Sequence, residues 1–125
     1  MPSLNQLEAQ KSLVDLLRSP DAFIEWVNSF PGDSQVGLAY SSCGCPVAKF
    51  LKDSKLGEFK IQEAEVYPRS VTVWVNGREP VTICDLPRWL QETIVAIDNY
   101  GQAHNRPIFI EGVKAALRKI TLQVT

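Results

Sequence analysis

The chain has 125 residues, of which 45% are apolar and 22% charged, and this composition is typical of one globular domain. Its 13 basic and 14 acidic side chains give a formal net charge of −1, which argues against a dedicated nucleic-acid-binding protein, because such proteins carry a basic excess. No apolar run approaches the length of a membrane span, which is about 20 residues, and no signal peptide is visible. The three cysteines, an odd number, do not form a disulfide framework. We therefore expect a soluble cytoplasmic protein.

Two amphipathic helices are predicted at the start of the chain. The first covers residues 3–18, because Ser3 and Gln6 fit a capping box and apolar residues recur at helical spacing. Its apolar stripe consists of Leu4, Leu7, Val14 and Leu17, widened by Leu13 and Leu16. The second helix begins at Ser19-Pro20 with Ser19 as the N-cap, and its stripe consists of Phe23, Ile24, Val27 and Phe30.

The middle of the chain changes from helical to strand periodicity. Residues 33–45 are predicted to form a loop rich in Ser and Gly, and a third helix is predicted to start at Cys45-Pro46. Residues 59–66 alternate between apolar and polar, but the phase of this alternation changes partway along. A single strand with a bulge near Gln62-Glu63 accounts for the change of phase.

A hairpin is predicted over residues 71–83, with its turn around Asn76-Gly77. A two-residue loop would pair Val75 with Arg78 and divide the apolar residues between the two faces of the hairpin. A loop with an odd number of residues places them on one face, which favours this register because one face must be buried. The buried face then carries Val71, Val73, Val75 and Val81, and Trp74 points away from it.

The last part of the chain is predicted to return to helices. Asp85 is the expected N-cap of a helix over residues 86–100, a last helix covers residues 108–120, and Leu122 and Val124 alternate in a short tail that could add a strand. Because the helices and strands are segregated along the chain, we predict one α+β domain over residues 1–125. Its small antiparallel sheet consists of the hairpin 71–83 and the strand 59–66, packed against about five helices.

Residues 43–101 resemble a pattern in small uncharacterised proteins of phages and bacteria. The resemblance rests on Cys45-Pro46-Val47-Ala48 at a helix start, on the Val-rich hairpin, and on Leu86-Pro87 before a helix that ends Ile97-Asp98-Asn99-Tyr100-Gly101. It implies no known activity. It favours an accessory protein that binds a partner over one that catalyses a reaction.

The pair Cys43 and Cys45 is the first candidate for chemistry. A thiol at a helix N-cap is surrounded by free N–H groups, so we expect Cys45 to have the lowest thiol pKa in the chain. The alternative is that Cys45 is a small buried apolar residue, whose pKa burial would raise, and that Cys43 is an ordinary loop residue. Cys84 follows Ile83 in a strand, so we expect packing to shield it from alkylating reagents.

Metal binding is the second candidate. Cys43, Cys45, Cys84 and His104 together would make a Cys₃His zinc set. Only Cys43 and Cys45 have a short spacing, so we expect no stoichiometric zinc and no cofactor. His104 could also serve as a base for Cys45 or Ser42, but a lone loop histidine is more simply a solvated residue, so no catalytic residue is assigned.

These observations favour a small non-enzymatic binding or interaction protein of phage or bacterial accessory type. Trp26 and Trp74 are its candidate interface residues, because aromatic side chains anchor interfaces. We expect the partner to be another protein or a second copy of the chain, rather than a membrane or a nucleic acid. The alternative is a thiol protein that uses Cys43 and Cys45, with Cys84 and His104, for redox or metal chemistry.

Overall fold

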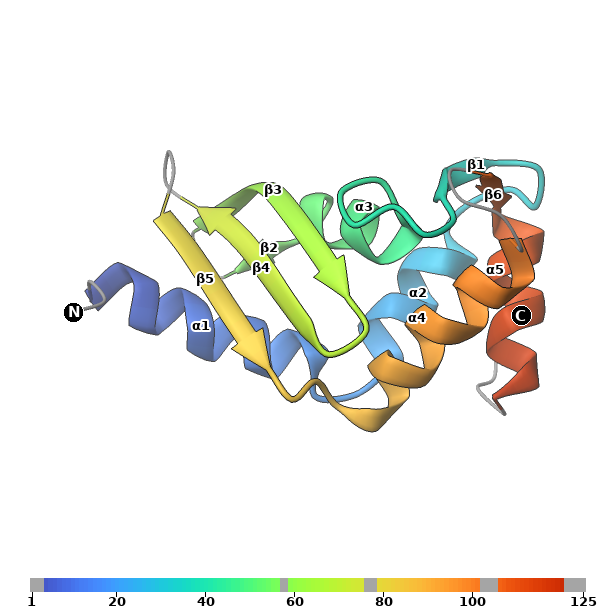
Figure 1. The fold of residues 1–125 in the computed structure, drawn as a ribbon. Helices are drawn as coiled ribbons and strands as arrows, with labels where there is room; N and C mark the ends of the chain where they lie inside the picture. The colour runs from blue at the N-terminus through green and yellow to red at the C-terminus, as the bar shows by residue number, and fades with distance from the viewer. Residues whose placement is uncertain (1–3, 57–58, 76–78, 102–105, 121–125) are drawn as a thin grey trace.

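The computed structural model describes residues 4–56, 59–75, 79–101 and 106–120. In these residues the chain forms a four-stranded antiparallel sheet, a two-stranded sheet and five helices (Figure 1). The larger sheet has the strand order β2-β3-β4-β5, and β1 pairs with β6 in the smaller one. The predicted α+β class is confirmed. The elements in chain order are α1 (Leu4–Leu17), α2 (Asp21–Asn28), β1 (Gln35–Leu38), α3 (Pro46–Lys52), β2 (Lys55–Leu56), β3 (Phe59–Tyr67), β4 (Ser70–Val75), β5 (Glu79–Cys84), α4 (Arg88–Gly101), β6 (Pro107–Phe109) and α5 (Ile110–Lys119).

The register of the β4–β5 hairpin is the one that the odd loop predicts. Val75 pairs with Glu79 and Val73 pairs with Val81; the three residues between Val75 and Glu79 lie outside the described residues. The side chains of Val71, Val73, Val75 and Val81 are all buried on one face. Trp74 therefore lies on the opposite face, as expected from the two-residue period of a strand.

The predicted bulge in β3 is also confirmed. The register between β3 and β4 shifts between Ile61 and Glu63. Ile61, Ala64 and Val66 are all buried, although an unbroken strand would place Ile61 and Ala64 on opposite faces. The extra residue of the bulge brings both of them to the core side of the sheet.

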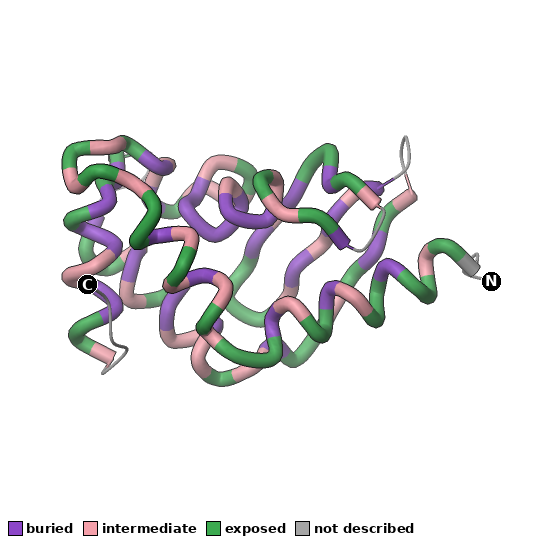
Figure 2. Tube along the Cα trace, turned by 180° about the vertical axis from the view of Figure 1, so that it is seen from behind, coloured by how far each residue is buried: buried purple, intermediate pink, exposed green. Residues whose placement is uncertain are grey.

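Helices cover only one face of the larger sheet. In Figure 1, α1 passes behind β5 and β4, and no described element lies in front of the strands. The view from behind in Figure 2 shows the buried residues where the helices meet the sheet. The outer edge of β5 is protected by α1, because Gln6 Nε2 donates to the Pro80 carbonyl at 2.9 Å and Gln10 Nε2 donates to the Thr82 carbonyl at 3.2 Å. Such contacts block a free strand edge from pairing with another chain.

The apolar stripe predicted for α1 is wrong in part. Leu13 and Leu17 are buried together with Ala9, but Leu7 is 50% exposed and Val14 is 44% exposed. The helix therefore buries a narrow line of residues spaced four apart. The hydrogen bonds from Gln6 and Gln10 to β5 help to determine which face of α1 is buried. The predicted capping box includes Ser3, which lies outside the described residues.

The starts of two helices differ from their predictions. Pro20 rather than Ser19 is the N-cap of α2, and Ser19 Oγ accepts from the Asp21 N–H at 3.4 Å. Asp85 is not the N-cap of α4. Its backbone has a φ of +57°, so it forms the bend between β5 and α4, and the Pro87 carbonyl accepts the first N–H groups of the helix.

The chain also contains strands that the sequence patterns did not predict. The predicted loop 33–45 contains β1, and residues 107–109 form β6, so α5 begins at Ile110. These strands have four and three residues, too few to show a period of two. The predicted strand in the tail, around Leu122 and Val124, lies outside the described residues.

The corrected face of α1 can be tested with two Leu→Ala variants. We expect Leu13→Ala to lower the free energy of unfolding by about 2–4 kcal/mol, because truncation of a fully buried leucine leaves a cavity. We expect Leu7→Ala, on the same helix but half exposed, to change it by less than about 0.5 kcal/mol. Urea unfolding followed by tryptophan fluorescence measures both changes. Losses of equal size would contradict the face assigned to α1.

Candidate functional site

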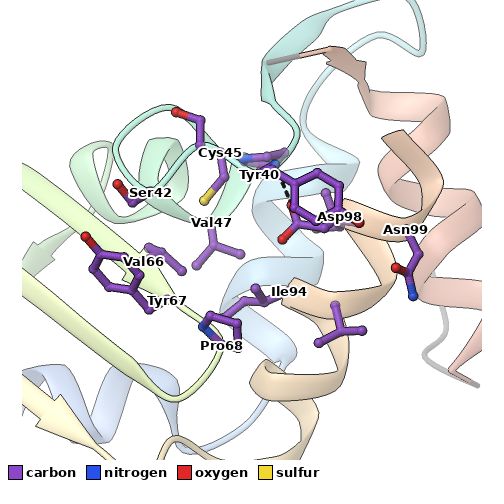
Figure 3. Close-up of a pocket in the computed structure, with 14 residues that line it drawn as sticks. Tyr40, Ser42, Cys45, Val47, Val66, Tyr67, Pro68, Ile94, Asp98 and Asn99 are labelled. Carbon is purple, nitrogen blue, oxygen red and sulfur yellow. Dashed lines mark hydrogen bonds between the residues drawn. The ribbon is translucent and has the colours of Figure 1, made fainter. Parts of the chain in front are cut away.

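A cavity of about 340 Å³ opens where the end of β3 faces α4 (Figure 3). Three parts of the chain form its wall: the loop that leads into α3, the end of β3 with Pro68, and the C-terminal half of α4. Its volume falls within the range of about 300–1,000 Å³ that is usual for small-molecule sites. The lining residues are Tyr40, Ser41, Ser42, Cys45, Pro46, Val47, Val66, Tyr67, Pro68, Ile94, Val95, Ile97, Asp98 and Asn99.

The loop that forms the first wall is folded back tightly on itself. Gly37 has a φ of +154°, and a Cβ at this position would lie 2.5 Å from the Gly44 carbonyl oxygen, so the close approach requires glycine. The Leu38 N–H donates to that same carbonyl at 2.8 Å. Within the loop, Ser41 Oγ accepts from the Gly44 N–H at 3.0 Å. Together these contacts fix the course of the chain into α3.

The loop is also tied to the two other walls of the cavity. The Val66 N–H of β3 donates to the Ser42 carbonyl at 2.8 Å. The Tyr40 N–H donates to Asp98 Oδ1 of α4, also at 2.8 Å. Tyr40 has a φ of +57°, a conformation that costs free energy for any residue with a side chain and that is common at functional sites. The bond to Asp98 holds this residue in place.

Gly101 allows α4 to approach the loop. A Cβ at Gly101 would collide with the Cβ of Ala39, the residue before Tyr40. Because Asp98 lies on α4 close to Gly101 in the chain, the same close approach brings its carboxylate to the Tyr40 N–H. The packing of a glycine therefore positions a charged group in the wall of the cavity.

Asp98 is the one charged side chain among the described residues that line the cavity. Partial burial raises the pKa of its carboxyl group, and the hydrogen bond from the Tyr40 N–H lowers it by less. None of the ion pairs between described residues involves Asp98. Its negative charge is thus partly removed from water without a cation beside it.

Cys45 caps α3, as its position before Pro46 predicts, and its Sγ accepts from the Ala48 N–H at 3.4 Å. The prediction that it has the lowest thiol pKa is nevertheless wrong. The pKa of Cys45 is raised to about 11, chiefly by burial; the hydrogen bond from the Ala48 N–H lowers it, and the negative charge of Asp98 raises it by a smaller amount. Desolvation outweighs the stabilisation of a thiolate at the helix N-terminus.

The other two thiols are exposed. Cys43 lies two residues before Cys45, with its Sγ 3.8 Å from Ser42 Oγ. Cys84 lies at the end of the edge strand β5, opposite Ser70 of β4, and is open to solvent. The prediction that packing shields Cys84 is therefore wrong, because the last residue of an edge strand on the open face has no neighbour to cover it.

The three cysteines among the candidate zinc ligands are not brought together. Across the ranges that the structure describes, no group of three or more His, Cys, Asp or Glu side chains could hold a metal ion. Cys43, Cys45 and Cys84 therefore do not share a site. His104, the fourth candidate ligand and the candidate base, lies outside the described residues.

The two candidate interface tryptophans are far from equivalent. Trp26 is half-buried in an aromatic cluster, with its ring 5.7 Å from Phe23 and 5.0 Å from Phe30, and its Nε1 donates to Asp53 Oδ2 at 3.0 Å. Trp74 lies on the open face of the larger sheet, opposite Pro80. Neither lines the cavity, and their role in an interface stays a prediction.

The sequence motifs did not predict Asp98, Tyr40 or Tyr67 as site residues. A signal for Asp98 was present, because it follows Ile94 by four positions and so lies on the apolar stripe of its helix. A carboxylate on a buried stripe is uncommon without a partner. The tyrosines gave no comparable signal, since the fold alone brings them to the cavity.

Comparison of the chain with models of protein families, with curated proteins and with solved structures finds no match. No helix in the described ranges combines the length and the apolar character needed to cross a membrane. A function can therefore be inferred only from the geometry and chemistry of the cavity.

The environments of the three thiols predict their order of alkylation. At pH 8 we expect iodoacetamide to modify Cys43 and Cys84 readily and Cys45 at least about 100-fold more slowly, because a pKa near 11 instead of 9.0 leaves little thiolate. Peptide mass spectrometry measures the three rates. In urea the rate at Cys45 should approach those of the other two. Modification of native Cys45 as fast as Cys43 would contradict its burial.

Proposed function

We propose that the chain is a small non-enzymatic binding protein whose ligand site is the cavity between the loop, the end of β3 and α4. The observation that carries this proposal is the composition of the wall. Apolar side chains such as Val47, Val66 and Ile94 make up much of it, and a few polar groups converge among them. This combination is typical of sites that hold small molecules.

Binding is favoured over catalysis by the state of the reactive groups in the wall. The Cys45 thiol is buried with a raised pKa, so it is a poor nucleophile at neutral pH. Ser41 Oγ is engaged by the Gly44 N–H, and the Asp98 carboxylate is engaged by the Tyr40 N–H. Among the described hydrogen bonds, none joins a nucleophile of the cavity to a base, which covalent catalysis would require.

The thiol alternative loses most of its support. Its chemistry would have to rest on Cys43, because Cys45 is protonated and Cys84 lies on the open face of the sheet. The buried and protonated Cys45 is a poor partner for Cys43 in a dithiol cycle. Nothing described at Cys43 favours a redox or metal function.

An interaction with another protein or with a second copy of the chain remains part of the proposal. The open face of the larger sheet carries Trp74, Thr72 and Thr82, and no described element covers it. An aromatic side chain on such a face suits an interface anchor. We also propose an accessory role in a phage or bacterium, which the resemblance of residues 43–101 favours, and a cytoplasmic location, which the composition and cysteine count of the sequence favour.

A fragment screen tests the cavity as a ligand site. Fragments are added to ¹⁵N-labelled protein, and we expect the amide shifts to cluster at Tyr40, Ser42, Val66 and Asp98. Tyr67→Ala should weaken binding about tenfold, because an aromatic contact at the mouth is lost. Tyr100→Ala is the matched control, since Tyr67 and Tyr100 are 48% and 47% exposed but only Tyr67 lines this cavity.

The same screen can overturn the proposal. Shifts that gather elsewhere, for example in the groove between α4 and α5 lined by Tyr100 and Ile120, would move the site away from the cavity. The absence of any bound fragment at millimolar concentration would also contradict the proposal. A Tyr67→Ala variant that binds as tightly as the Tyr100→Ala control would show that the mouth of the cavity plays no part.

A further inference from the structure

We propose that the cavity binds an organic ammonium ion with an apolar body, held through Asp98. This inference rests on the proposed function, because it names the chemical class of the ligand for the same site. Its basis is the contrast between the single carboxylate of Asp98 and the wall of apolar, hydroxyl, amide and thiol groups around it. No lysine or arginine lines the cavity, so no described residue of the wall neutralises this charge.

The second oxygen of Asp98 is available to a ligand. The hydrogen bond from the Tyr40 N–H is made by Oδ1, and no other bond to the carboxylate occurs among the described residues. No fully buried side-chain oxygen in this part of the chain lacks a hydrogen-bond partner. It follows that Oδ2 is in contact with solvent. Asp98 lines the cavity. An acceptor-only oxygen at this place can accept a hydrogen bond from a ligand in place of water.

A cation satisfies this oxygen better than a neutral donor. Partial burial has raised the pKa of Asp98, which means that its charged form is poorly solvated where it stands. A positive charge at Oδ2 restores the lost stabilisation and adds a charge-assisted hydrogen bond. An anion would be repelled by the same carboxylate. A divalent metal would need more ligands, and none of the described clusters supplies them.

The remaining wall explains the apolar body of the ligand. In Figure 3 the Asp98 side chain lies on one side of the cavity, and Val66, Tyr67 and Pro68 lie on the other. Tyr67 and Tyr40 both line the cavity and are both about half exposed. Aromatic rings attract ammonium groups through their π-electrons. An ion with a hydrocarbon or aromatic body can therefore place its charge at Asp98 and its body against the apolar wall.

Binding of benzylamine and of benzyl alcohol tests this assignment, because the two probes have nearly the same shape and only the amine is cationic at neutral pH. Each is titrated into the wild-type protein and into Asp98→Asn, with amide shifts as the readout. Asparagine keeps an oxygen to accept from the Tyr40 N–H, and it replaces the charged acceptor Oδ2 with a neutral NH2 donor that cannot bind an ammonium group. Glu92→Gln is the matched control, since Glu92 lies on the same helix, pairs with Arg88 at 2.8 Å and does not line the cavity.

We expect benzylamine to bind the wild-type cavity at least about tenfold more tightly than benzyl alcohol, since the carboxylate adds a charged hydrogen bond. Asp98→Asn should remove this preference, with benzyl alcohol unchanged, and Glu92→Gln should preserve it. The comparison of the two probes on the wild-type protein does not depend on whether a variant folds. Shift changes at Tyr40 and Val66 confirm the place of binding.

Two outcomes would overturn the inference, and a third would support it and identify the source of the ammonium group. If the amine and the alcohol bind the cavity equally, the site takes neutral ligands, and the proposed function stands without the ammonium class. If benzylamine binds and Asp98→Asn has no effect, the charge is recognised elsewhere. If Nα-acetyl-lysine methylamide binds more tightly than benzylamine, and Asp98→Asn removes this binding, the ammonium group belongs to a lysine of a partner protein rather than to a free small molecule.

Discussion

The hydrogen bond between the Tyr40 N–H and Asp98 Oδ1, 2.8 Å long, is the contact on which the candidate site depends. It joins the loop before α3 to α4, two parts of the chain 58 residues apart. A hydrogen bond to a charged group contributes about 1.5–3 kcal/mol, enough to offset a strained backbone at Tyr40. It also fixes Asp98, the one charged side chain among the described residues of the cavity wall. Without this bond the carboxylate could rotate toward water, and the loop would keep only its packing against Gly101 as a contact with the helix.

Cys45 shows how the same fold decides between two opposing effects on one group. Its place at the start of α3 supplies an N–H donor to the sulfur, as the sequence predicts. The same place also packs the thiol under the loop and near the negative charge of Asp98, and both raise its pKa. Capping of a helix by a thiol and chemical reactivity of that thiol are therefore separable. A sequence motif can establish the first, and only the surrounding fold establishes the second.

The sequence predicts those parts of the fold in which apolar residues recur with a regular spacing and must all lie on one buried face. The hairpin register follows because Val73 and Val81 must share a face, and the bulge near Glu63 follows from a break in the same alternation. The pairing of β1 with β6 could not be predicted in this way. It joins two segments of three or four residues that are distant in the chain, and the chosen face of α1 depends likewise on which strand Gln10 meets.

The candidate site was less predictable than the fold, because its walls are distant in the sequence. Of its residues, Cys45 and Ser42 were the two that the sequence singled out for chemistry; the structure gives Cys45 a capping role, and the Ser42 carbonyl ties the loop to β3. Asp98 carried a readable signal, a carboxylate in an apolar helical stripe, but the meaning of this signal depends on what lies opposite. Had a lysine faced it, the carboxylate would be half of an internal ion pair. Because none of the described residues of the wall is a cation, the carboxylate is open to a ligand.

The ties between the walls also determine how much order a ligand would have to impose. The loop is bonded to β3 through Ser42 and Val66 and to α4 through Tyr40 and Asp98. Its backbone is further fixed by the close approach of Gly37 to Gly44. Because three independent contacts hold the walls in place, the cavity exists before a ligand arrives, and binding need not supply the entropy of ordering a loop. The free energy of the few contacts in a small cavity with one carboxylate is therefore not offset by the entropy of ordering a loop, and these contacts can bind a ligand selectively.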